Sequence, residues 1–418
     1  MPTLPVLVLN SGSSSIKFSM YEAEGDERSK LLEGEVEGIG AGAGGAVGKF
    51  WIKSWLNVAD HAGADGSKVV DETPSVANVD EAFELIAKAL KEPPFPRPAA
   101  IGHRMVCGGP TVTENQRITP ALIDEMERYT AFAPLHTPVA IYIMRQVMRE
   151  FPDVPNFVCL DSYFHRNLPA VTRRLPIPAE YSTMGLRRFG AHGLSYESIV
   201  AHLQREDGTS FPPRLIVAHL GNGASICAIR DGQSADTSMG LTPTGGLISG
   251  SRTGDLDPGV LLFILRKLAE KSKDTSEVAN QLEKIVNKQS GLLGLSELTN
   301  DMRDLRKAIA EGNVTARLAV DEFAYVIRKY IGSYMAVLGG LDMLVFTGGI
   351  GENDAATRAE TCAGLESLGI LLDAELNQTH GEAKISAGGS PVTVRVIPPA
   401  EDLTIVNHVC RLLDEKKS

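Results

Sequence analysis

The chain opens on a hydrophobic run, PVLVLN at residues 5–10, which predicts a buried strand. After a turn rich in Gly and Ser, residues 15–22 alternate, with Ile16, Phe18 and Met20 on one face. This period of two predicts a second strand, so the turn joins two strands of a hairpin. A Walker A loop would instead run into a helix, and it needs a second glycine before its lysine. The opening stretch VLNSGSSSIK is therefore not a Walker A loop.

The same pattern recurs in the second half of the chain. Residues 215–233, LIVAHLGNGASICAIRDGQ, give an apolar strand, a Gly/Asn turn and an alternating strand that again begins Ser-Ile. We interpret the two hairpins as an internal duplication. The length of 418 residues agrees, because two large domains are the simplest division of such a chain.

Hydrophobic spacing predicts several further elements. Helices are expected at about 79–91, 139–151, 259–272, 275–289 and 314–338, and strands near 99–106 and at 156–161. Residues 342–354, DMLVFTGGIGEND, predict a strand, a glycine turn and a helix. The expected helix at 314–338 carries a wide apolar stripe, which fits either core packing or a dimer face. The stripe consists of Phe323, Val326, Ile327, Tyr330, Ile331, Tyr334 and Met335.

Composition narrows the class of protein. Hydrophobic residues make up 43% and charged residues 22%, as in soluble globular proteins, and the formal net charge is −11. That charge argues against nucleic-acid and membrane partners, which would need a broad basic face. A small anionic substrate stays possible, because a few arginines in one cleft can override the global field.

The cysteines and the first residues of the chain indicate the cellular compartment. Five cysteines are scattered without a C-x-x-C pair, which favours a reduced cytoplasmic protein over a zinc or disulfide framework. The apolar start is short and no basic residue precedes it, so it does not predict a signal peptide. No apolar run is long enough to span a bilayer.

Three glycine-rich turns each follow an apolar strand: NSGSSS, HLGNGAS and TGGIGEN. Glycine lets backbone N–H groups approach an anion closely, and concave runs of such groups bind phosphate. Each turn alone also fits simple turn geometry, and GGIGEN lacks the third glycine of a Rossmann fingerprint. Together with the repeated hairpin, the three turns favour a nucleotide cleft between two related domains.

Five polar residues stand in apolar or glycine-rich contexts: Arg104, His136, Asp161, His192 and Arg252. Arginine offers a planar fork that suits carboxylate and phosphate. Each residue also has a structural alternative: a turn or N-cap for the aspartate, a satisfied loop or core position for the histidines, and a surface ion pair for the arginines. No H-E-x-x-H, paired Cys/His set or G-x-S-x-G elbow occurs, so zinc hydrolysis and serine esterase chemistry have no support.

Taken together, the motifs resemble the acetate kinase family. The matching stretches run in family order from the first residues to about residue 405: VLNSGSSSIKF, HRMVCGG, APLHTP, LDSYFH, RFGAHG, HLGNGAS, DTSMGLTP, SRTGDLDPG, SGLLG, DMRD, FTGGIGEN and VIPPAED. The resemblance implies two duplicated actin-like (ribonuclease H-like) α/β domains flanking a nucleotide cleft, and a cytoplasmic homodimer. It implies a first domain of 1–165 plus about 402–418 and a second of 166–401, the latter with the nucleotide site and the dimer interface.

The reaction that the resemblance implies is phosphorylation of a short-chain carboxylate by ATP, reversibly, to give ADP and an acyl phosphate with Mg²⁺ or Mn²⁺. The catalytic positions it implies are Arg104, His136, Asp161, His192 and Arg252, of which Asp161 is expected mainly to orient the substrate or an arginine. The substrate positions are Arg104, Val106, Leu135, Ala191 and Pro243. The nucleotide positions are Lys17, His219, Leu220, Gly221, Asn222, Gly223, Asp301, Met302, Arg303, Gly349, Ile350, Gly351, Glu352 and Asn353. The metal positions are Asn10 and Glu401, and a helix-start acid is the structural alternative for Glu401.

The sequence departs from the family pattern near the expected substrate position. Ala191 stands where the family usually has Phe, and Leu194 and Tyr196 replace the usual Thr and His. The loop TPTGGLISGSR at 242–252 also differs. Loss of the large side chain at Ala191 predicts room for a chain longer than acetate, so propionate or butyrate should be used appreciably.

Three functions therefore stay in view. The first is an ATP:short-chain carboxylate kinase, and the second is a dedicated propionate or butyrate kinase. The third is a non-catalytic nucleotide-binding scaffold of actin-like fold. Such a scaffold would be expected to lose Arg104, Asp161, His192 or Arg252, and the presence of all four disfavours it.

Overall fold

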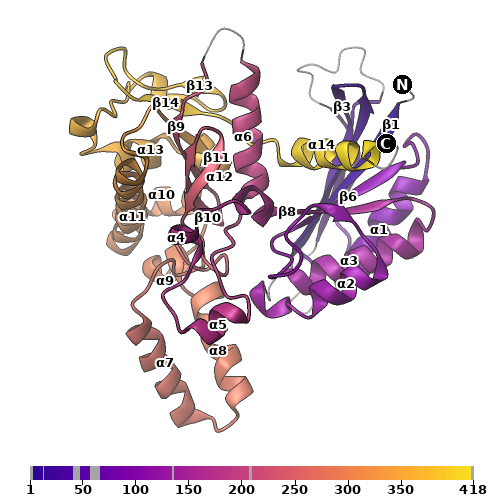
Figure 1. Ribbon diagram of the computed structural model, residues 1–418, viewed down its shortest axis with the longest axis horizontal. Helices are drawn as coiled ribbons and strands as arrows, with labels where there is room; N and C mark the ends of the chain where they lie inside the picture. Colours follow the sequence, from indigo (N-terminus) through magenta and orange to yellow (C-terminus); the bar gives the residue numbers. More distant parts are fainter. Residues whose placement is uncertain are drawn as a thin grey trace. The chain divides into compact units, whose positions relative to one another are not determined.

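The computed structural model describes residues 3–12, 14–40, 48–56, 66–133, 136–206 and 210–415. The chain forms two compact units, the first from residues 1–163 with 400–418 and the second from residues 164–399. Figure 1 shows both units, with most of their helices and several of their strands labelled. Each unit is described by itself.

The first unit is built on a mixed sheet. Its strands are β1 (Leu4–Ser11), β2 (Ser15–Glu24), β3 (Glu27–Glu37), β4 (Lys49–Ser54), β5 (Ser67–Glu72), β6 (Ala100–Met105), β7 (Gln116–Arg117) and β8 (Asn156–Leu160). Its helices are α1 (Val79–Lys91), α2 (Pro120–Glu127), α3 (Thr137–Glu150) and α14 (Glu401–Asp414), with short 3₁₀ helices η2 (Thr130–Phe132) and, at the end of the unit, η3 (Asp161–His165). Among the described residues the strand order is β5-β4-β3-β2-β1-β6-β8-β7. The strand β1 pairs antiparallel with β2 and parallel with β6, which pairs parallel with β8.

Helices cover both faces of this sheet. Ile101 of β6 packs with Ile143 and Val147 of α3 in one hydrophobic cluster. A β-carbon at the next residue, Gly102, would lie on the other face and collide with Ile405 of α14. Strand residues alternate between faces, so the missing side chain lets the C-terminal helix lie directly on β6.

The second unit contains the remaining elements. Its strands are β9 (Arg214–Leu220), β10 (Ala224–Arg230), β11 (Gln233–Thr237), β12 (Met343–Thr347), β13 (Ala383–Lys384) and β14 (Thr393–Val396). Its helices are α4 (Ala170–Arg173), α5 (Ala179–Thr183), α6 (Gly193–Arg205), α7 (Pro258–Lys271), α8 (Thr275–Lys288), α9 (Gly291–Ser296), α10 (Met302–Ala310), α11 (Val314–Leu338), α12 (Gly348–Asn353) and α13 (Ala355–Cys362), with 3₁₀ helices η4 (Glu366–Leu368) and η5 (Leu376–Gln378). In the described part of this unit the strand order is β11-β10-β9-β12-β14-β13.

The central strand β9 is buried on both faces. Ile216 and Ala218 belong to a cluster with α11, whereas Leu215 and Val217 pack with residues of α6. Figure 1 shows α6 and α11 on opposite sides of the sheet. This explains why the sequence of β9 is continuously hydrophobic rather than alternating.

The two sheets share one topology. The order β3-β2-β1-β6-β8 in the first unit matches β11-β10-β9-β12-β14 in the second, with the hairpin strands antiparallel and the later strands parallel. The internal duplication predicted from the two hairpins is confirmed by this match. The predicted fold class, two duplicated actin-like α/β domains, is also confirmed.

Two sequence interpretations are decided by the helices. The apolar stripe at 323–335 is core, because Phe323, Ile327, Ile331 and Tyr334 are buried and the other three pack against the same cluster. The strand, glycine turn and helix predicted at 342–354 are confirmed, with the turn reduced to one residue: β12 ends at Thr347, Gly348 has φ 78°, and α12 runs from Gly348 to Asn353. None of the helices in the described ranges is long and apolar enough to cross a membrane.

Candidate functional site

Three charged side chains meet at the ends of β6 and β8. Arg104 lies on β6, Asp161 follows β8 directly, and Glu401 begins α14. The two strands are parallel neighbours, so their carboxyl ends lie at the same edge. Arg104 Nη2 donates to Asp161 Oδ2 at 2.8 Å and its Nε lies 3.2 Å from both carboxylate oxygens, while Nη1 lies 3.4 Å from Glu401 Oε2.

Burial strengthens the electrostatic attraction within this ion pair relative to a surface pair, because the surrounding dielectric is lower. The Asp161 side chain is only 1% exposed and that of Arg104 is 19% exposed. Burial by itself lowers the pKa of the Arg104 guanidinium, but Asp161 and Glu401 outweigh it and raise that pKa. The neighbouring Asp402 is half-buried, and this burial raises the pKa of its carboxyl group although Ser19 donates to it at 2.7 Å. The pair is more buried than the surface ion pair considered for Arg104, and Asp161, which opens η3 as its turn or N-cap alternative expected, also pairs with this arginine.

The two other polar candidates on the first hairpin face each other. Asn10 at the end of β1 is paired in register with Lys17 of β2, so both side chains point to one face. Lys17 is largely exposed and its Nζ lies 3.8 Å from Glu35 Oε1. Burial raises the pKa of the Glu35 carboxyl group, and the lysine opposes that shift.

The remaining candidates of the first unit flank β6 and α3. Val106 follows β6 directly and is half-buried, and its carbonyl accepts from the backbone N–H of Ser162 at 3.2 Å. His136 is the N-cap residue of α3. Leu135 lies outside the described residues.

In the second unit, His192 occupies the N-cap of α6 in a left-handed conformation with φ 56°. This is uncommon for a residue other than glycine. Its Nδ1 lies 2.8 Å from the hydroxyl of Ser225 on β10. Its ring stacks on His219 of β9 with centroids 4.2 Å apart, and His219 Nδ1 lies 2.9 Å from Ser195 Oγ. The imidazole is therefore held by a hydrogen bond on one edge and by stacking on one face.

Arg252 reaches the same place from another loop. A β-carbon at Gly223 would lie 3.4 Å from both Arg252 Nη1 and His192 Nε2, so the two groups converge beside this glycine. The loop is held by α9, whose Leu292 and Leu293 N–H groups donate to the carbonyls of Ser249 and Gly250. Burial lowers the pKa of the Arg252 guanidinium, which still remains a cation at neutral pH.

Packing explains why the motif SGLLG has a glycine at its second position, Gly291. Gly291 has φ 63°, and a β-carbon there would lie 2.7 Å from the carbonyl oxygen of Arg252. A side chain would force the start of α9 away from the loop that carries this arginine. The glycine thus supports the site through the backbone.

A cavity of about 830 Å³ adjoins this cluster within the second unit. It collects eight of the residues predicted as nucleotide positions: Gly221, Asn222, Asp301, Met302, Arg303, Gly349, Ile350 and Asn353. Asp301 is the N-cap of α10 and accepts from Arg303 through backbone and side chain, which lowers the pKa of its carboxyl group. Four further predicted nucleotide positions are sequence neighbours of these residues: Leu220, Gly223, Gly351 and Glu352. Burial raises the pKa of the Glu352 carboxyl group.

The cavity also contains residues that the sequence did not single out: Asn300, Arg306, Asp354 and His380. Arg306 lies one turn beyond Met302 on α10, a spacing that could have indicated it. Its guanidinium donates to Asp354 at 2.9 Å and to Glu360 at 2.7 Å. His380 had no local signal, because it reaches the cavity from a distant segment.

A buried arginine fixes that segment. Arg358 of α13 is fully buried and donates to the carbonyls of Gly351 and Glu352 at the end of α12, each at 2.9 Å. The same guanidinium donates to Asn377 Oδ1 at 2.9 Å and to the Thr379 carbonyl at 3.0 Å. It therefore ties the GIGEN helix to the turn that precedes His380.

The two predicted substrate positions in the second unit are Ala191, which precedes His192, and Pro243, which lies on a loop. Ala191 is only 3% exposed, and its carbonyl accepts from Nε2 of the buried His165 at 3.2 Å. Pro243 is half-buried in the loop after β11. Burial lowers the pKa of His165 to about 4, so its imidazole is neutral at neutral pH.

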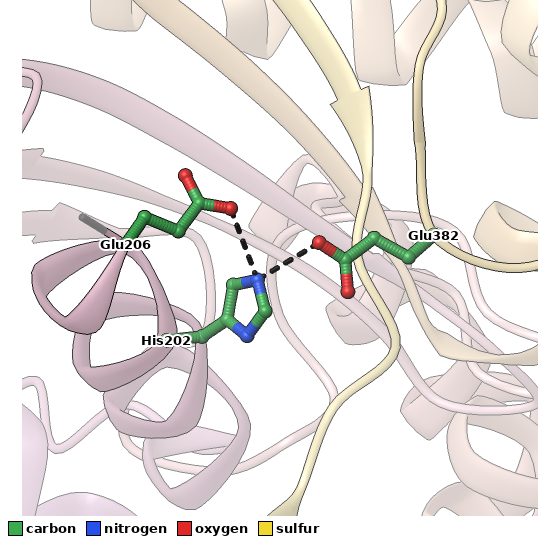
Figure 2. Close-up of side chains that lie close together, drawn as sticks. All are labelled: His202, Glu206 and Glu382. Carbon is green, nitrogen blue, oxygen red and sulfur yellow. Dashed lines mark hydrogen bonds and ion pairs between the residues drawn. The ribbon is translucent and has the colours of Figure 1, made fainter. Parts of the chain in front are cut away.

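A second cluster of potential metal ligands lies at the far end of α6. Figure 2 shows His202 between Glu206 and Glu382, with Nε2 at 3.3 and 2.9 Å from their carboxylates. Arg395 of β14 donates to both oxygens of Glu206 at 2.7 Å and to Glu382 at 2.8 Å. Arg395 hydrogen-bonds directly to these carboxylates, closer than Arg104 approaches Glu401, so we interpret the cluster as an ion-pair network that fixes α6 to β14.

With this geometry in hand, comparison with known proteins decides the family. The family model described as the acetokinase family matches residues 5–407. The chain belongs to this family. The resemblance drawn from the motifs is thereby confirmed, and the chain is a kinase with a carboxyl group as acceptor. A non-catalytic scaffold is not supported.

Individual relatives cover nearly the whole chain. The acetate kinase of Heliobacterium modesticaldum is 37% identical over 98% of this chain and 99% of its own length. The solved acetate kinase of Porphyromonas gingivalis has a TM-score of 0.82 and 34% identity, and covers 98% of this chain and 100% of that one. A solved propionate kinase from Francisella tularensis has a TM-score of 0.83 and 33% identity over the same shares of the two chains.

Proposed function

We propose that this member of the acetokinase family phosphorylates a short-chain carboxylate with ATP, giving ADP and an acyl phosphate in a reversible reaction. The observation that carries the proposal is the convergence of His192 and Arg252 beside Gly223, next to the cavity that collects the nucleotide positions. Two hydrogen-bond donors there suit the oxygens of a phosphoryl group in transfer.

The chemistry asks for positioning and charge stabilisation. One carboxylate oxygen of the substrate attacks the γ-phosphorus, the bond from that phosphorus to the β,γ-bridging oxygen breaks, and ADP leaves with the electron pair. A carboxylate is already nucleophilic at neutral pH, so no general base is needed. Arg252 and the Nε2–H of His192 would stabilise the equatorial oxygens during transfer, and His136 would assist them.

In the first unit, Arg104 would hold the substrate carboxylate. Asp161 takes up Nε and one terminal nitrogen of this guanidinium, so its role would be to orient the arginine rather than to move a proton. Val106, Leu135, Ala191 and Pro243 would line the acyl chain, as the family pattern implies.

The nucleotide would occupy the cavity of about 830 Å³. The N-terminal end of α10 at Asp301 and the α12 segment would border it, and Lys17 would contact the phosphates. A divalent cation would be held by Asn10 and Glu401, which offer amide and carboxylate oxygens, the hard ligands that Mg²⁺ and Mn²⁺ prefer. Glu401 Oε2 also lies 3.4 Å from Arg104 Nη1, so the cation would share this carboxylate with the guanidinium. Bound there, Mg²⁺ would supply neutralising charge for the phosphates.

We further propose that two copies of the chain pair through the second unit. The helix α7 has the sequence PGVLLFILRKLAEK, yet none of its residues is buried. Its Val260, Leu262 and Phe263 are exposed, as is Tyr325 of α11. Within the described residues α7 packs against α8 but leaves these apolar side chains exposed, which supports an interface, and a second copy of the chain is the occupant that the family resemblance implies.

All five cysteines are free thiols, which agrees with a reducing compartment such as the cytoplasm.

The activity can be tested with purified protein, ATP, Mg²⁺ and a panel of carboxylic acids, with hydroxylamine trapping the acyl phosphate. We expect product with acetate and with longer acids. In the Arg252→Ala variant, kcat should fall more than about a thousandfold while nucleotide binding persists. The exposed Arg149→Ala variant on α3 serves as the control. An Arg252→Ala enzyme of normal kcat would contradict the assigned role.

A further inference from the structure

A chain of hydroxyl groups lies behind His192. Ser225 Oγ is 2.8 Å from His192 Nδ1 and also hydrogen-bonds the hydroxyl of Tyr196. Tyr196 and Ser225 are both fully buried, so bulk water does not compete for these bonds. The family pattern has His at the position of Tyr196, so this terminal hydroxyl is a feature of the present sequence.

The imidazole has little freedom to leave this chain. His192 begins α6 with φ 56°, and His219 stacks on its ring at 4.2 Å with an interplanar angle of 29°. The ring nitrogen that Ser225 does not contact, Nε2, points to Gly223, where Arg252 also converges. One nitrogen thus faces the hydroxyl chain and the other faces the proposed phosphoryl position.

We propose that Ser225 and Tyr196 are positioning residues that fix the tautomer of His192. Tyr196 donates to Ser225, Ser225 donates to Nδ1, and the proton of the neutral imidazole therefore lies on Nε2, where it can donate to the transferring phosphoryl group. This rests on the proposed function, in which His192 stabilises phosphoryl oxygens. The opposite tautomer would turn a lone pair toward those oxygens and repel them.

The hydroxyl chain acts only on the neutral ring. When His192 takes up a second proton, Nδ1–H donates to Ser225 and the serine hydroxyl turns to Tyr196. Nε2 carries a proton in that state with or without the serine. Among the described residues, the titratable and charged groups near the ring include His219 on β9, Arg252 on its loop, Tyr196 on α6 and His165 behind Ala191.

A pH-resolved comparison of variants separates tautomer control from simple packing. In Ser225→Ala we expect kcat to fall about tenfold at a pH of about 8.5 and less than about twofold at a pH of about 5.5, relative to the unsubstituted enzyme at the same pH. KM for ATP and carboxylate should change little. Tyr196→Phe keeps the ring and should show the same trend with a smaller loss.

The control is Ser198→Ala, a buried serine on the same helix whose hydroxyl donates to the Ser195 carbonyl. Its effect should not depend on pH. An equal loss in Ser225→Ala at both pH values, or no loss at either, would overturn the proposal.

Nitrogen-15 NMR of the histidine rings tests the tautomer without reference to turnover. The neutral His192 of the unsubstituted protein should carry its proton on Nε2, and Ser225→Ala should give a mixture of tautomers. An unchanged tautomer in Ser225→Ala would refute the role of the hydroxyl chain. If instead His192→Ala kept full activity, the proposed function of His192 would fail, whereas the NMR result would still decide the hydroxyl chain.

Discussion

Arg104 and Asp161 form a two-point ion pair at the ends of neighbouring parallel strands. The guanidinium donates from Nη2 at 2.8 Å and from Nε at 3.2 Å to a carboxylate that is 1% exposed. Its remaining terminal nitrogen, Nη1, lies toward Glu401. This geometry fixes the plane of the arginine fork, which matters for binding a planar carboxylate.

The pair predicts the effect of Asp161→Asn. The amide keeps the shape but removes the charge and one acceptor, so Arg104 should lose its fixed orientation. We expect kcat/KM for the carboxylate to fall about 100-fold or more, with nucleotide binding unchanged. Steady-state kinetics and nucleotide titration measure this. Asp153→Asn, at an exposed position, is the control, and an Asp161→Asn enzyme with normal kcat/KM would contradict the orienting role.

The residue at position 191 predicts the range of substrates. Ala191 is smaller than the usual Phe, and one methylene in an apolar pocket changes discrimination by only about 1–3 kcal/mol. We expect kcat/KM for propionate within about 100-fold of that for acetate, and Ala191→Phe should shift the ratio toward acetate. Ala179→Phe, at an exposed site, is the matched control. A stronger preference of the unsubstituted enzyme for acetate would refute the enlarged pocket.

The exposed apolar helix α7 predicts the assembly. Phe263 is 62% exposed, so glutamate at this position should leave the folded chain intact while placing charge in the proposed interface. We expect light scattering after size exclusion to give the mass of two chains for the unsubstituted protein and of one chain for Phe263→Glu. Val171→Glu introduces the same charge at a residue that is 86% exposed, and it should remain paired. A Phe263→Glu protein that stays dimeric would place the interface elsewhere.

The buried histidines predict how stability depends on pH. Burial lowers the pKa of His103 and of His165 to about 4, from an ordinary value of 6.5. The folded state therefore resists a proton that the unfolded chain accepts, so their stabilising contribution is present above pH 6.5 and is lost as the pH falls toward 4.

The measurement is urea unfolding over that pH range. Each histidine should contribute a slope of about 1.4 kcal/mol per pH unit between the two pKa values. In His165→Gln, whose amide can still donate to the Ala191 carbonyl, the slope for the second unit should be smaller. An unchanged slope would show that His165 does not resist protonation. The exposed His380→Gln variant is the control.

Much of the fold could be predicted locally. The helix expected at 314–338 is α11 with the same bounds, and the hairpins at 5–22 and 215–233 exist as β1–β2 and β9–β10. The hydrophobic periodicity of a helix or strand depends on residues close in sequence, so it can be recognised without tertiary information. The glycine turn after β12 is a single residue: Gly348 has φ 78°, and a β-carbon there would lie 2.8 Å from the carbonyl oxygen of Leu220 on β9. The close approach of β9 therefore requires glycine at this position.

The sequence alone determined the order of elements, the duplication and which polar residues stand at strand ends. Tertiary structure decided which of them meet. Arg104 and Asp161 are far apart in the chain, and only the parallel pairing of β6 with β8 joins them. In the same way, only the folded chain brings Ser225 of β10 to His192. The buried Arg358 holds the segment that carries His380 into the cavity. Contacts between distant segments depend on the packing of whole elements, and no local pattern encodes that.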